Sequence, residues 1–352
     1  MINVAAITSG RNVPSARFRV RQHVDVLREM GVCIRERIPP IEKYAPAPGW
    51  MSRLTQYGCP GFLVECGWRA VKRSARIPGI LESRRSQVTW LERLLLPGRL
   101  TEEWLLKRPL VFDVDDAIWL FPPGGLHAAA AVGRRADVVV AGNEYIADWF
   151  RAHARQVRVI PTAVDTDHYH PGRGSHADGF TVGWIGTSSN LPFLEAIEAP
   201  LRRFLEEHPD SRLLVVADRP PMFRAVPRNK VRYIPWSMGG EAEALREMHV
   251  GLMPLPDTEW TRGKCSFKML LYMATGIPAV VSPVGMNREI LDIGSVGVGA
   301  NDDEGWYEAL SCYHRDPHRR ESDGREGRAI AVQKFGKRIV AKALLQIFRE
   351  LA

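Results

Sequence analysis

The stretch RGKCSFKMLLYMATGIPAVVSPVG, residues 262–285, predicts a loop, a helix, a turn and a strand in that order. Ser266 is a residue type that commonly caps a helix, and Gly276 followed by Pro278 is typical of a helix end. Between them, four apolar residues recur at helical spacing: Phe267, Leu270, Leu271 and Ala274. The sequence therefore predicts a helix with one apolar face.

Two lysines stand at the start of this helix, Lys264 just before it and Lys268 in its first turn. The unpaired N–H groups of a helix N-terminus already make that end positive, so two cations there oppose the helix dipole. The conflict disappears if an anion such as a diphosphate lies among Lys264, Lys268 and the helix end. The alternative is two solvated surface lysines, since an exposed lysine at a helix start costs only roughly a few tenths of a kcal/mol.

The length and charge of the chain limit its class. A chain of 352 residues suits two domains, and a net charge of +8 implies attraction to a polyanion: nucleic acid, an anionic membrane or a phosphorylated substrate. The excess is concentrated in residues 1–100, where 17 basic residues face seven acidic ones. The base-rich segment 61–81 is compatible with an interfacial amphipathic helix, or with a helix packed on its own domain with a solvated basic face.

The five cysteines form no CxxC pair and no ligand spacing with histidine, so the sequence predicts neither a zinc site nor a disulfide framework. The N-terminus carries no signal-peptide pattern, and no apolar run reaches membrane-spanning length. We therefore expect a soluble cytoplasmic protein, compatible with peripheral contact at the inner face of the membrane.

The N-terminal part of the chain begins with a strand at 2–8, and its loop holds Gly10 and Arg11 before a helix capped by Ser15. This loop lacks the GxGxxG of a dinucleotide site. Residues 39–100 are interrupted by proline, glycine and tryptophan, and apart from the helical pattern at 61–81 no elements are predicted there. The pattern becomes clear again at LVFDV, a strand that ends at Asp115 and Asp116.

The βα alternation stops in a polar, turn-rich segment and restarts at residue 180. Two serial βα arrays predict an α/β fold with two doubly wound, Rossmann-like parallel sheets. We assign residues 1–165 to the first domain, 166–179 to a linker and 180–334 to the second domain. A final amphipathic helix, 335–352, is able to pack on either domain. Ligands of such sheets bind beyond the carboxyl ends of the strands, so the site is expected in a cleft between the domains.

Several segments together resemble the GT-B glycosyltransferases, in particular the retaining family 4. VIPTAVDTDHYHP, residues 159–171, resembles the linker signature of that family, and residues 267–285 resemble its donor-site motif. The resemblance implies two Rossmann-like domains facing a cleft. It also implies transfer of a sugar from a nucleotide diphosphate sugar to an acceptor hydroxyl with retention at the anomeric carbon, and it implies no metal or other cofactor.

The resemblance places the small residues Gly186, Thr187 and Ser188 at a loop where free N–H groups let a diphosphate come close. It gives Lys264 and Lys268 the catalytic role of neutralising the leaving diphosphate. The other residues expected at the donor site are Gly10, Arg11, Asp257, Arg262, Gly263, Cys265 and Ser266.

Asp115 occupies a strand end where many relatives carry a histidine that faces the sugar and the acceptor. As a catalytic residue it would orient the acceptor hydroxyl or stabilise developing positive charge; the alternative is a carboxylate that caps a loop. The sequence DVDD, residues 113–116, also mimics the metal-binding DxD of a different fold. Asp113 lies within the strand, where alternation points it away from usable geometry, so no metal ligand is predicted.

Two features depart from the family pattern. A pair of glutamates common in the family corresponds here to Gly263 and Leu271, and the basic residue common after the first strand of the second domain is absent from GTSSN. Asp257, Glu259 or Arg262 is the expected substitute for the glutamates.

The departures leave two alternatives to an active transferase, a nucleotide-sugar-binding scaffold without catalysis and a nucleotide-sugar epimerase of the same fold. The predicted partners are a nucleotide sugar and an anionic, lipid-linked or saccharide acceptor. No nucleic-acid partner is predicted, because no nucleic-acid-binding motif accompanies the charge.

Overall fold

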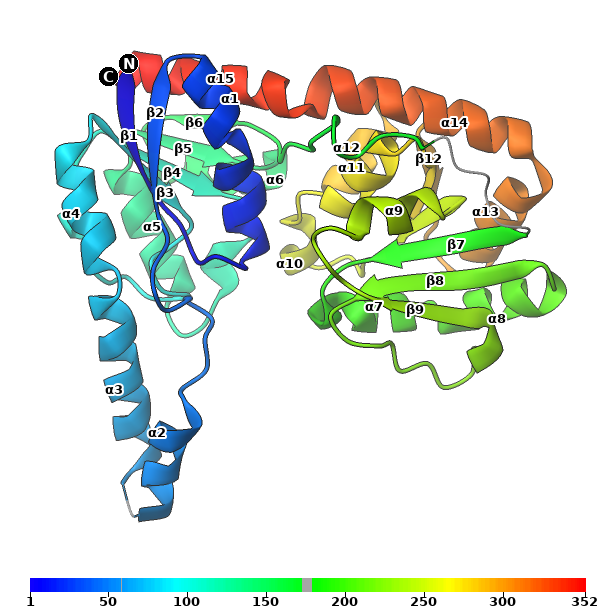
Figure 1. The fold of residues 1–352 in the computed structure, drawn as a ribbon, viewed down its shortest axis with the longest axis horizontal. Helices are drawn as coiled ribbons and strands as arrows, with labels where there is room; N and C mark the ends of the chain where they lie inside the picture. The colour runs from blue at the N-terminus through cyan, green and yellow to red at the C-terminus, as the bar shows by residue number, and fades with distance from the viewer. Residues whose placement is uncertain (58, 173–178) are drawn as a thin grey trace. The chain divides into compact units, whose positions relative to one another are not determined.

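The computed structural model describes residues 1–57, 59–172 and 179–352, and the chain forms two compact units (Figure 1). The N-terminal unit comprises residues 1–162 and 340–352, and the C-terminal unit comprises residues 163–339. Each unit contains a six-stranded parallel sheet with helices packed against it. The predicted α/β fold with two doubly wound parallel sheets is confirmed. Part of the predicted linker, residues 173–178, lies outside the described residues.

The N-terminal sheet has the strand order β2-β1-β3-β4-β5-β6. Its central strands are buried on both faces by helices, which explains why they read as nearly continuous apolar runs in the sequence. The strands are β1 (Ile2–Ile7), β2 (Val32–Arg37), β3 (Val88–Glu92), β4 (Leu110–Val114), β5 (Val138–Ala141) and β6 (Val157–Val159).

A helix start of this unit is capped by Asn143, whereas the cap predicted at Ser15 is wrong. Asn143 caps α6 (Glu144–Arg151), because its side chain accepts a hydrogen bond from the Ile146 N–H at 2.9 Å. Ser15 does not cap a helix, because its own backbone is already helical, with φ of −59° and ψ of −41°. The remaining helices are η1 (Ala16–Val20), η2 (Arg21–His23), α1 (Val24–Glu29), α2 (Gly49–Arg53), η3 (Leu54–Tyr57), α3 (Gly61–Ser74), α4 (Ile77–Arg85), η4 (Glu103–Leu105), η5 (Ile118–Leu120) and α5 (Gly125–Arg135).

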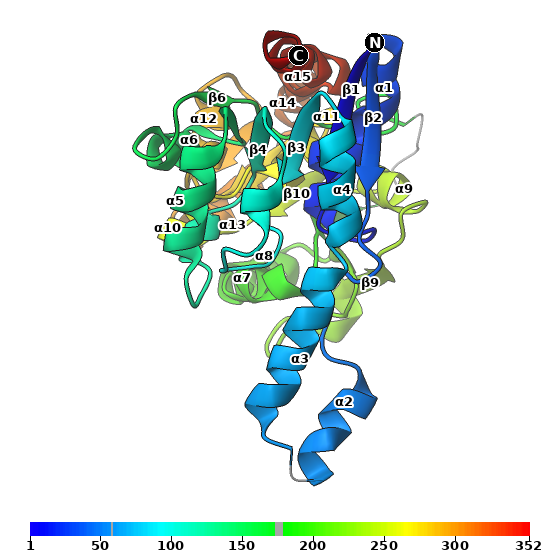
Figure 2. The same ribbon diagram turned by 90° about the vertical axis from the view of Figure 1, so that its left-hand side faces the viewer.

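Residues 39–100, where the sequence indicated only a helical pattern at 61–81, contain β3 and a helical hairpin. Figures 1 and 2 show α2 and α3 side by side, extending away from the sheet of the N-terminal unit. The indole N–H of Trp68 on α3 donates to the Ala45 carbonyl at 3.1 Å, which ties the base of the hairpin together. We call residues 49–57 and 61–74 the α2–α3 hairpin.

The C-terminal sheet has the order β12-β11-β10-β7-β8-β9. Its strands are β7 (Phe180–Ile185), β8 (Ser211–Ala217), β9 (Val231–Pro235), β10 (Val250–Met253), β11 (Ala279–Val281) and β12 (Gly297–Gly299). Its helices are η6 (Ser188–Asn190), α7 (Leu191–Glu195), α8 (Glu198–Glu207), η7 (Arg228–Lys230), α9 (Glu241–Arg246), α10 (Glu259–Arg262), α11 (Phe267–Ala274), α12 (Met286–Leu291), α13 (Asp303–Arg315), α14 (Pro317–Ile330) and η8 (Ala331–Phe335).

Most of the last helix, α15 (Lys337–Leu351), belongs to the N-terminal unit, which includes residues 340–352. Phe348 packs edge-on against Trp90 of β3, with ring centres 5.3 Å apart, and both side chains are fully buried. Such an aromatic pair adds to the stabilisation that comes from burying the two rings.

Candidate functional site

Helix α11 is anchored to the middle of the C-terminal sheet by Tyr272. The Tyr272 ring lies on Gly251 of β10, where an added Cβ would come within 2.3 Å of the ring. Its hydroxyl accepts a hydrogen bond from the Ile185 N–H at 3.3 Å and donates one to the Leu252 carbonyl at 3.1 Å. These contacts connect α11 to both β7 and β10, so the helix is held against the carboxyl end of β7.

The predicted end of this helix is confirmed. Gly276 has a φ of +73°, a left-handed conformation that glycine adopts at little cost. Its N–H donates to the Met273 carbonyl at 3.0 Å, and the Ile277 N–H donates to the Tyr272 carbonyl at 2.9 Å. This pair of hydrogen bonds is the Schellman motif, which satisfies carbonyls at the helix end.

The prediction of a single apolar face is wrong, because α11 is buried on all sides from Met269 to Ala274. The side away from the sheet is covered by α14 and η8. Gly327 of α14, for example, is so close that an added Cβ would lie 3.4 Å from the Met273 side chain.

The predicted side-chain cap by Ser266 is also wrong. Ser266 has a left-handed backbone, with a φ of +49°, and its side chain makes no capping hydrogen bond. Instead, its Oγ donates to the Asn287 Oδ1 at 2.7 Å, and the Asn287 Nδ2 donates to the Ser282 carbonyl at 2.9 Å. Ser266 therefore joins the start of α11 to the turn between β11 and α12.

That turn supports the connection between α10 and α11 through Gly285. Gly285 has a φ of +52°, and an added Cβ would lie only 2.6 Å from the Arg262 carbonyl oxygen. Because no side chain fits there, the turn packs directly on the backbone that leads to Gly263 and Lys264. The backbone around Lys264 and Lys268 is therefore held by Gly285 on one side and by the contact of Ser266 with Asn287 on the other.

Lys264 and Lys268 are both partly buried and both lie over aromatic rings. The Lys264 Nζ is 4.9 Å from the ring centre of Trp260, and the Lys268 Nζ is 5.4 Å from that of Trp184. A cation over an indole is attracted by the negative face of the ring. The structure therefore favours defined positions for the two ammonium groups over the alternative of two solvated surface lysines.

Gly186 brings the loop after β7 against Lys268. An added Cβ at Gly186 would lie 2.7 Å from the Lys268 Cε and 2.8 Å from the Trp184 ring. The absence of a side chain at Gly186 is therefore what allows the lysine and the loop to share this space.

The expected free N–H groups of this loop are not found at two of its three positions. The Gly186 N–H donates to the Val216 carbonyl at 3.0 Å, and the Ser188 N–H donates to the Asp218 Oδ1 at 2.6 Å. The Ser188 Oγ donates to the other Asp218 oxygen at 2.7 Å. The prediction was wrong because the Gly186 N–H continues the hydrogen bonding of β7 with β8, and because it did not include Asp218, which follows β8 and binds Ser188.

Asp218 is a residue of this site that the sequence analysis missed. Burial alone would raise the pKa of its carboxyl, but the two hydrogen bonds from Ser188 outweigh that effect and lower the pKa. Asp218 is therefore ionised at neutral pH. The available signal was its place directly after the buried strand RLLVVA, at the same edge of the sheet as Gly186.

Arg262 and Asp257 form a paired group at α10, next to the start of α11. The Arg262 Nε and Nη2 lie 2.6 and 3.1 Å from the two Asp257 oxygens, and this hydrogen bonding lowers the pKa of Asp257. Gly263 and Cys265 are buried between this pair and the helix. Leu271, at the second glutamate position of the family pattern, is only 4% exposed and belongs to the core.

Asp115 lies in the N-terminal unit, paired with Arg93. The Arg93 Nε is 2.5 Å from the Asp115 Oδ1, and its Nη2 is 2.5 Å from the Asp116 Oδ2. Burial alone would raise the pKa of Asp115, but the charge of Arg93 outweighs burial and lowers it. Arg93, which holds both carboxylates at this strand end, was also missed by the sequence analysis.

Asp113 points into the core, in agreement with the alternation of β4. It accepts hydrogen bonds from the Arg19 Nε at 2.7 Å and the Trp90 Nε1 at 3.1 Å. Burial raises its pKa to about 6, although the ion pair with Arg19 acts in the opposite direction. Across residues 1–57, 59–172 and 179–352, no three His, Cys, Asp or Glu side chains are grouped to hold a metal ion.

Gly10 and Arg11 lie in a loop that is covered by Glu42. An added Cβ at Gly10 would come 2.6 Å from the Glu42 Cγ, and the Glu42 carboxylate accepts a hydrogen bond from the Asn12 N–H at 2.8 Å. Arg11 is exposed, and its carbonyl accepts a hydrogen bond from Arg21 at 2.8 Å. In this structure Gly10 therefore makes room for a carboxylate.

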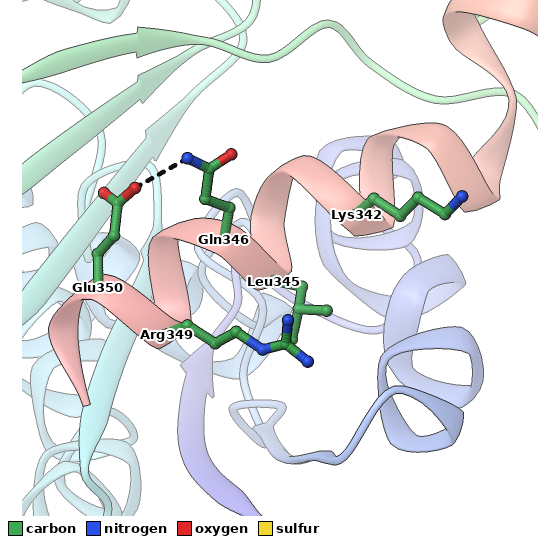
Figure 3. A pocket seen from close by; sticks show the side chains of 5 residues that line it. All are labelled: Lys342, Leu345, Gln346, Arg349 and Glu350. Atoms are coloured by element: carbon green, nitrogen blue, oxygen red, sulfur yellow. Dashed lines mark hydrogen bonds between the residues drawn. The ribbon is translucent and has the colours of Figure 1, made fainter.

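A surface pocket of about 460 Å³ lies along α15, away from every predicted site residue. Figure 3 shows that its five lining side chains all project from this one helix, with Gln346 donating to Glu350. The lining residues are Lys342, Leu345, Gln346, Arg349 and Glu350.

Among the described helices, none has the length and apolar character needed to cross a bilayer.

Comparison with known proteins agrees with this architecture. Residues 180–316 match a family model described as Glycosyl transferases group 1, and this range includes Gly186, Lys264 and Lys268. No curated protein sequence matches the chain.

Solved structures resemble the chain over its whole length. Sucrose-phosphate synthase from Thermosynechococcus elongatus has a TM-score of 0.72 at 14% identity, covering 100% of this chain and 99% of its own. HepE from Anabaena in complex with UDP-glucose has a TM-score of 0.71 at 13% identity, covering 99% of this chain and 100% of its own. MnaA from S. aureus, solved with UDP, has a TM-score of 0.60 at 13% identity, covering 100% and 98%.

The two parallel-sheet units and the similar structures define a GT-B fold. Together with the group 1 domain in the C-terminal unit, they support a glycosyltransferase.

Proposed function

We propose that the protein is a retaining glycosyltransferase of family 4 that moves a sugar from a nucleotide diphosphate sugar to an acceptor hydroxyl. The observation that carries this proposal is the meeting of Gly186, Trp184 and Lys268 at the start of α11, where an added Cβ at Gly186 would lie 2.7 Å from the lysine. This arrangement joins a close backbone approach, a cation and a positive helix end in one place.

The chemistry of this place suits a departing nucleoside diphosphate. When the bond from the sugar to the diphosphate breaks, negative charge grows on the leaving phosphate oxygen. Lys264, Lys268 and the N-terminus of α11 supply positive charge toward that oxygen, and the aromatic rings under the two ammonium groups hold them in position. The proposed role of the lysines is thus electrostatic, and no metal or other cofactor takes part.

Asp257 compensates in part for the missing glutamates. It is paired with Arg262, the residue before Gly263, which is the first of the two altered positions, so a carboxylate and a guanidinium stand close to that position. A carboxylate can accept hydrogen bonds from sugar or ribose hydroxyls, as a glutamate would. We therefore assign these contacts to Asp257. UDP-sugars are the first donors to test, because UDP or UDP-glucose is bound in two of the three similar structures described above.

A panel of nucleotide sugars separates the proposed activity from its two alternatives. With acceptor present, a retaining transferase releases the nucleoside diphosphate and forms a product whose anomeric configuration, read by NMR, equals that of the donor. A scaffold without catalysis binds a donor and releases nothing. An epimerase changes the donor sugar without any acceptor.

We propose further that the acceptor is anionic, lipid-linked or a saccharide, and that the N-terminal unit contacts the inner face of the membrane from the cytoplasm. The α2–α3 hairpin carries large apolar side chains exposed to solvent: Trp50, Leu54, Tyr57, Phe62 and Leu63. The exposed Arg53 and the half-buried Arg69 accompany them. Aromatic rings favour the bilayer interface, and arginines are attracted to anionic lipid head groups.

Sedimentation with vesicles tests the membrane contact. The wild type is expected to bind vesicles that contain phosphatidylglycerol and not vesicles of phosphatidylcholine alone, and Trp50→Ser with Phe62→Ser should abolish binding. Trp104→Ser is the matched control, because Trp104 is 64% exposed and Trp50 is 66% exposed in the same unit. Equal binding by wild type and the hairpin variant would contradict the proposal.

A further inference from the structure

A buried arginine in the N-terminal unit has no hydrogen-bond partner. Arg76 lies at the junction of α3 and α4 and is only 3% exposed. Within the described part of the chain, its Nε, Nη1 and Nη2 atoms are all buried without a hydrogen-bond partner. A guanidinium has five N–H donors, and leaving them unsatisfied in the interior is costly.

Two lysines lie close to Arg76 and add positive charge. Lys43 is also 3% exposed, and its Nζ donates to the Leu94 carbonyl at 3.2 Å. The Lys72 Nζ donates to the Lys43 carbonyl at 3.1 Å. Burial lowers the pKa of Lys43 to about 8 and that of Arg76 to about 10, and the charge of Arg76 contributes to the lowering at Lys43. The three cations therefore influence one another.

The carboxylate nearest in effect to Arg76 is Glu92, at the end of β3. One Glu92 oxygen accepts hydrogen bonds from the N–H and Oγ of Ser9, so it is occupied. The other, Oε1, is 3.7 Å from the Arg93 Nε and has no hydrogen-bond partner in the described residues. Arg76 and Glu92 interact electrostatically but form no ion pair within 4.0 Å. The donors of Arg76 therefore have no acceptor from the described chain.

We infer that Arg76, Lys43 and Lys72 form a subsite for a phosphate group carried by the acceptor. The subsite lies at the carboxyl ends of β1 and β3, the edge of the sheet where ligands of doubly wound folds bind. The guanidinium fork matches phosphate oxygens, and the lysines add charge. Tyr44, next to Lys43, is 46% exposed, so the subsite lies just beneath the surface. This inference rests on the proposed glycosyltransferase function and specifies the chemical class of its acceptor.

Thermal shift with methyl phosphate tests the subsite in the full chain carrying Lys264→Ala and Lys268→Ala, which removes the proposed donor site. Methyl phosphate is expected to raise the melting temperature of this parent, and the added change Arg76→Met should abolish that rise. Arg85→Met is the control, because Arg85 is an exposed arginine on α4, and it should keep the rise. Lys72→Met should reduce the rise, which keeps the test valid if Arg76→Met does not fold.

Three further measurements separate the alternatives. Without ligand, Arg76→Met should melt at the same or a higher temperature, because it removes an unsatisfied buried charge. If instead its melting temperature falls, and methyl phosphate does not raise the melting temperature of the parent, Arg76 forms a water-bridged pair with Glu92 and the inference is overturned. With Lys264 and Lys268 intact, UDP should still raise the melting temperature of Arg76→Met. A failure of the proposed donor site is therefore distinguished from a failure of the phosphate subsite. A larger rise in melting temperature with glucose 6-phosphate indicates a soluble phosphate, and a larger rise with dihexanoyl phosphatidic acid indicates a lipid phosphate. If neither compound raises the melting temperature, the inference is overturned.

Discussion

The ammonium of Lys268 lies 5.4 Å from the ring centre of Trp184, so the first turn of α11 and the end of β7 meet through a cation–π contact. Trp184 is fully buried and its position is set by the core of the sheet. Gly186 leaves open the space in which the two side chains meet. The contact thus fixes a positive charge beside a loop without a side chain, at a helix end that is itself positive.

Gly186→Ala should weaken donor binding by displacing Lys268. The new Cβ would lie 2.7 Å from the Lys268 Cε and 2.8 Å from the Trp184 ring, and the lysine stem is the more mobile of the two. We expect a fall in UDP affinity of roughly tenfold, the loss of about one charge-assisted contact. Titration calorimetry measures it.

Gly239→Ala is the matched control for that change. An added Cβ at Gly239 meets no atom within 4 Å, so UDP affinity should stay at the wild-type value. Unchanged affinity in both variants would remove Gly186 from the donor site.

Asp115→Asn should bind UDP normally and turn over slowly, at least about tenfold below wild type, if the carboxylate acts on the acceptor or the transition state. Asp116→Asn is the comparison, because Arg93 holds both carboxylates at 2.5 Å and each change removes one of these contacts. Initial rates and calorimetry are measured for both. An equal loss of rate in the two variants would assign Asp115 a purely structural role with Arg93.

Turnover should be unchanged after treatment with EDTA, because the proposed positive charges at the leaving group are Lys264, Lys268 and the helix end. Loss of activity in EDTA that magnesium or manganese restores would point to a carboxylate site. Asp115 would then be the first ligand to test, since Asp113 is fully buried and held by Arg19 and Trp90, whereas Asp115 is partly exposed.

The stability of the fold should rise with pH through the titration of Lys43. Burial lowers its folded-state pKa from 10.5 to about 8, and the charged groups acting on it are Glu92, Arg93, Asp115 and Arg76. Between these two values the unfolded chain binds the proton that the folded chain has lost, so the free energy of unfolding increases with pH in this window.

The measurement is the melting temperature of wild type minus that of Lys43→Met at pH 7 and at pH 10. The difference should shift in favour of the wild type at the higher pH. A constant difference would show that Lys43 does not titrate in this range.

The fold could be predicted where the sequence pattern of an element depends only on its own residues. Strands such as β7 and β10 read as apolar runs because helices cover both of their faces, and Gly276 marked a helix end that depends only on its own φ. Strand β3 could not be predicted, because its Glu92 is buried only through hydrogen bonds to Ser9, 83 residues away. The helices in the same stretch, residues 39–100, were hard to predict because proline and glycine interrupt the helical pattern.

The candidate site divides in a similar way. Lys264 and Lys268 were proposed from the rule for charges at helix ends and Gly186 from the family resemblance, and the structure brings Gly186 and Lys268 together. Asp218 was missed, because its role at the loop depends on a contact with Ser188, 30 residues away. The side chain of Ser266 was assigned to the wrong partner, since its Oγ donates to the Asn287 Oδ1, 21 residues further along, and accepts no hydrogen bond from a helix N–H.

Titration of UDP into wild type, Lys264→Ala and Lys268→Ala tests the diphosphate site most directly, with Lys334→Ala as the control because Lys334 is an exposed lysine of the same unit. Each site variant should lose roughly 1.5 to 3 kcal/mol of binding free energy, about ten- to a hundredfold in affinity, while the control binds as the wild type does. Melting temperatures without ligand should be little changed, since each variant also removes repulsion from the positive end of α11. Equal UDP affinity in all four proteins would contradict the assignment of Lys264 and Lys268 to the diphosphate.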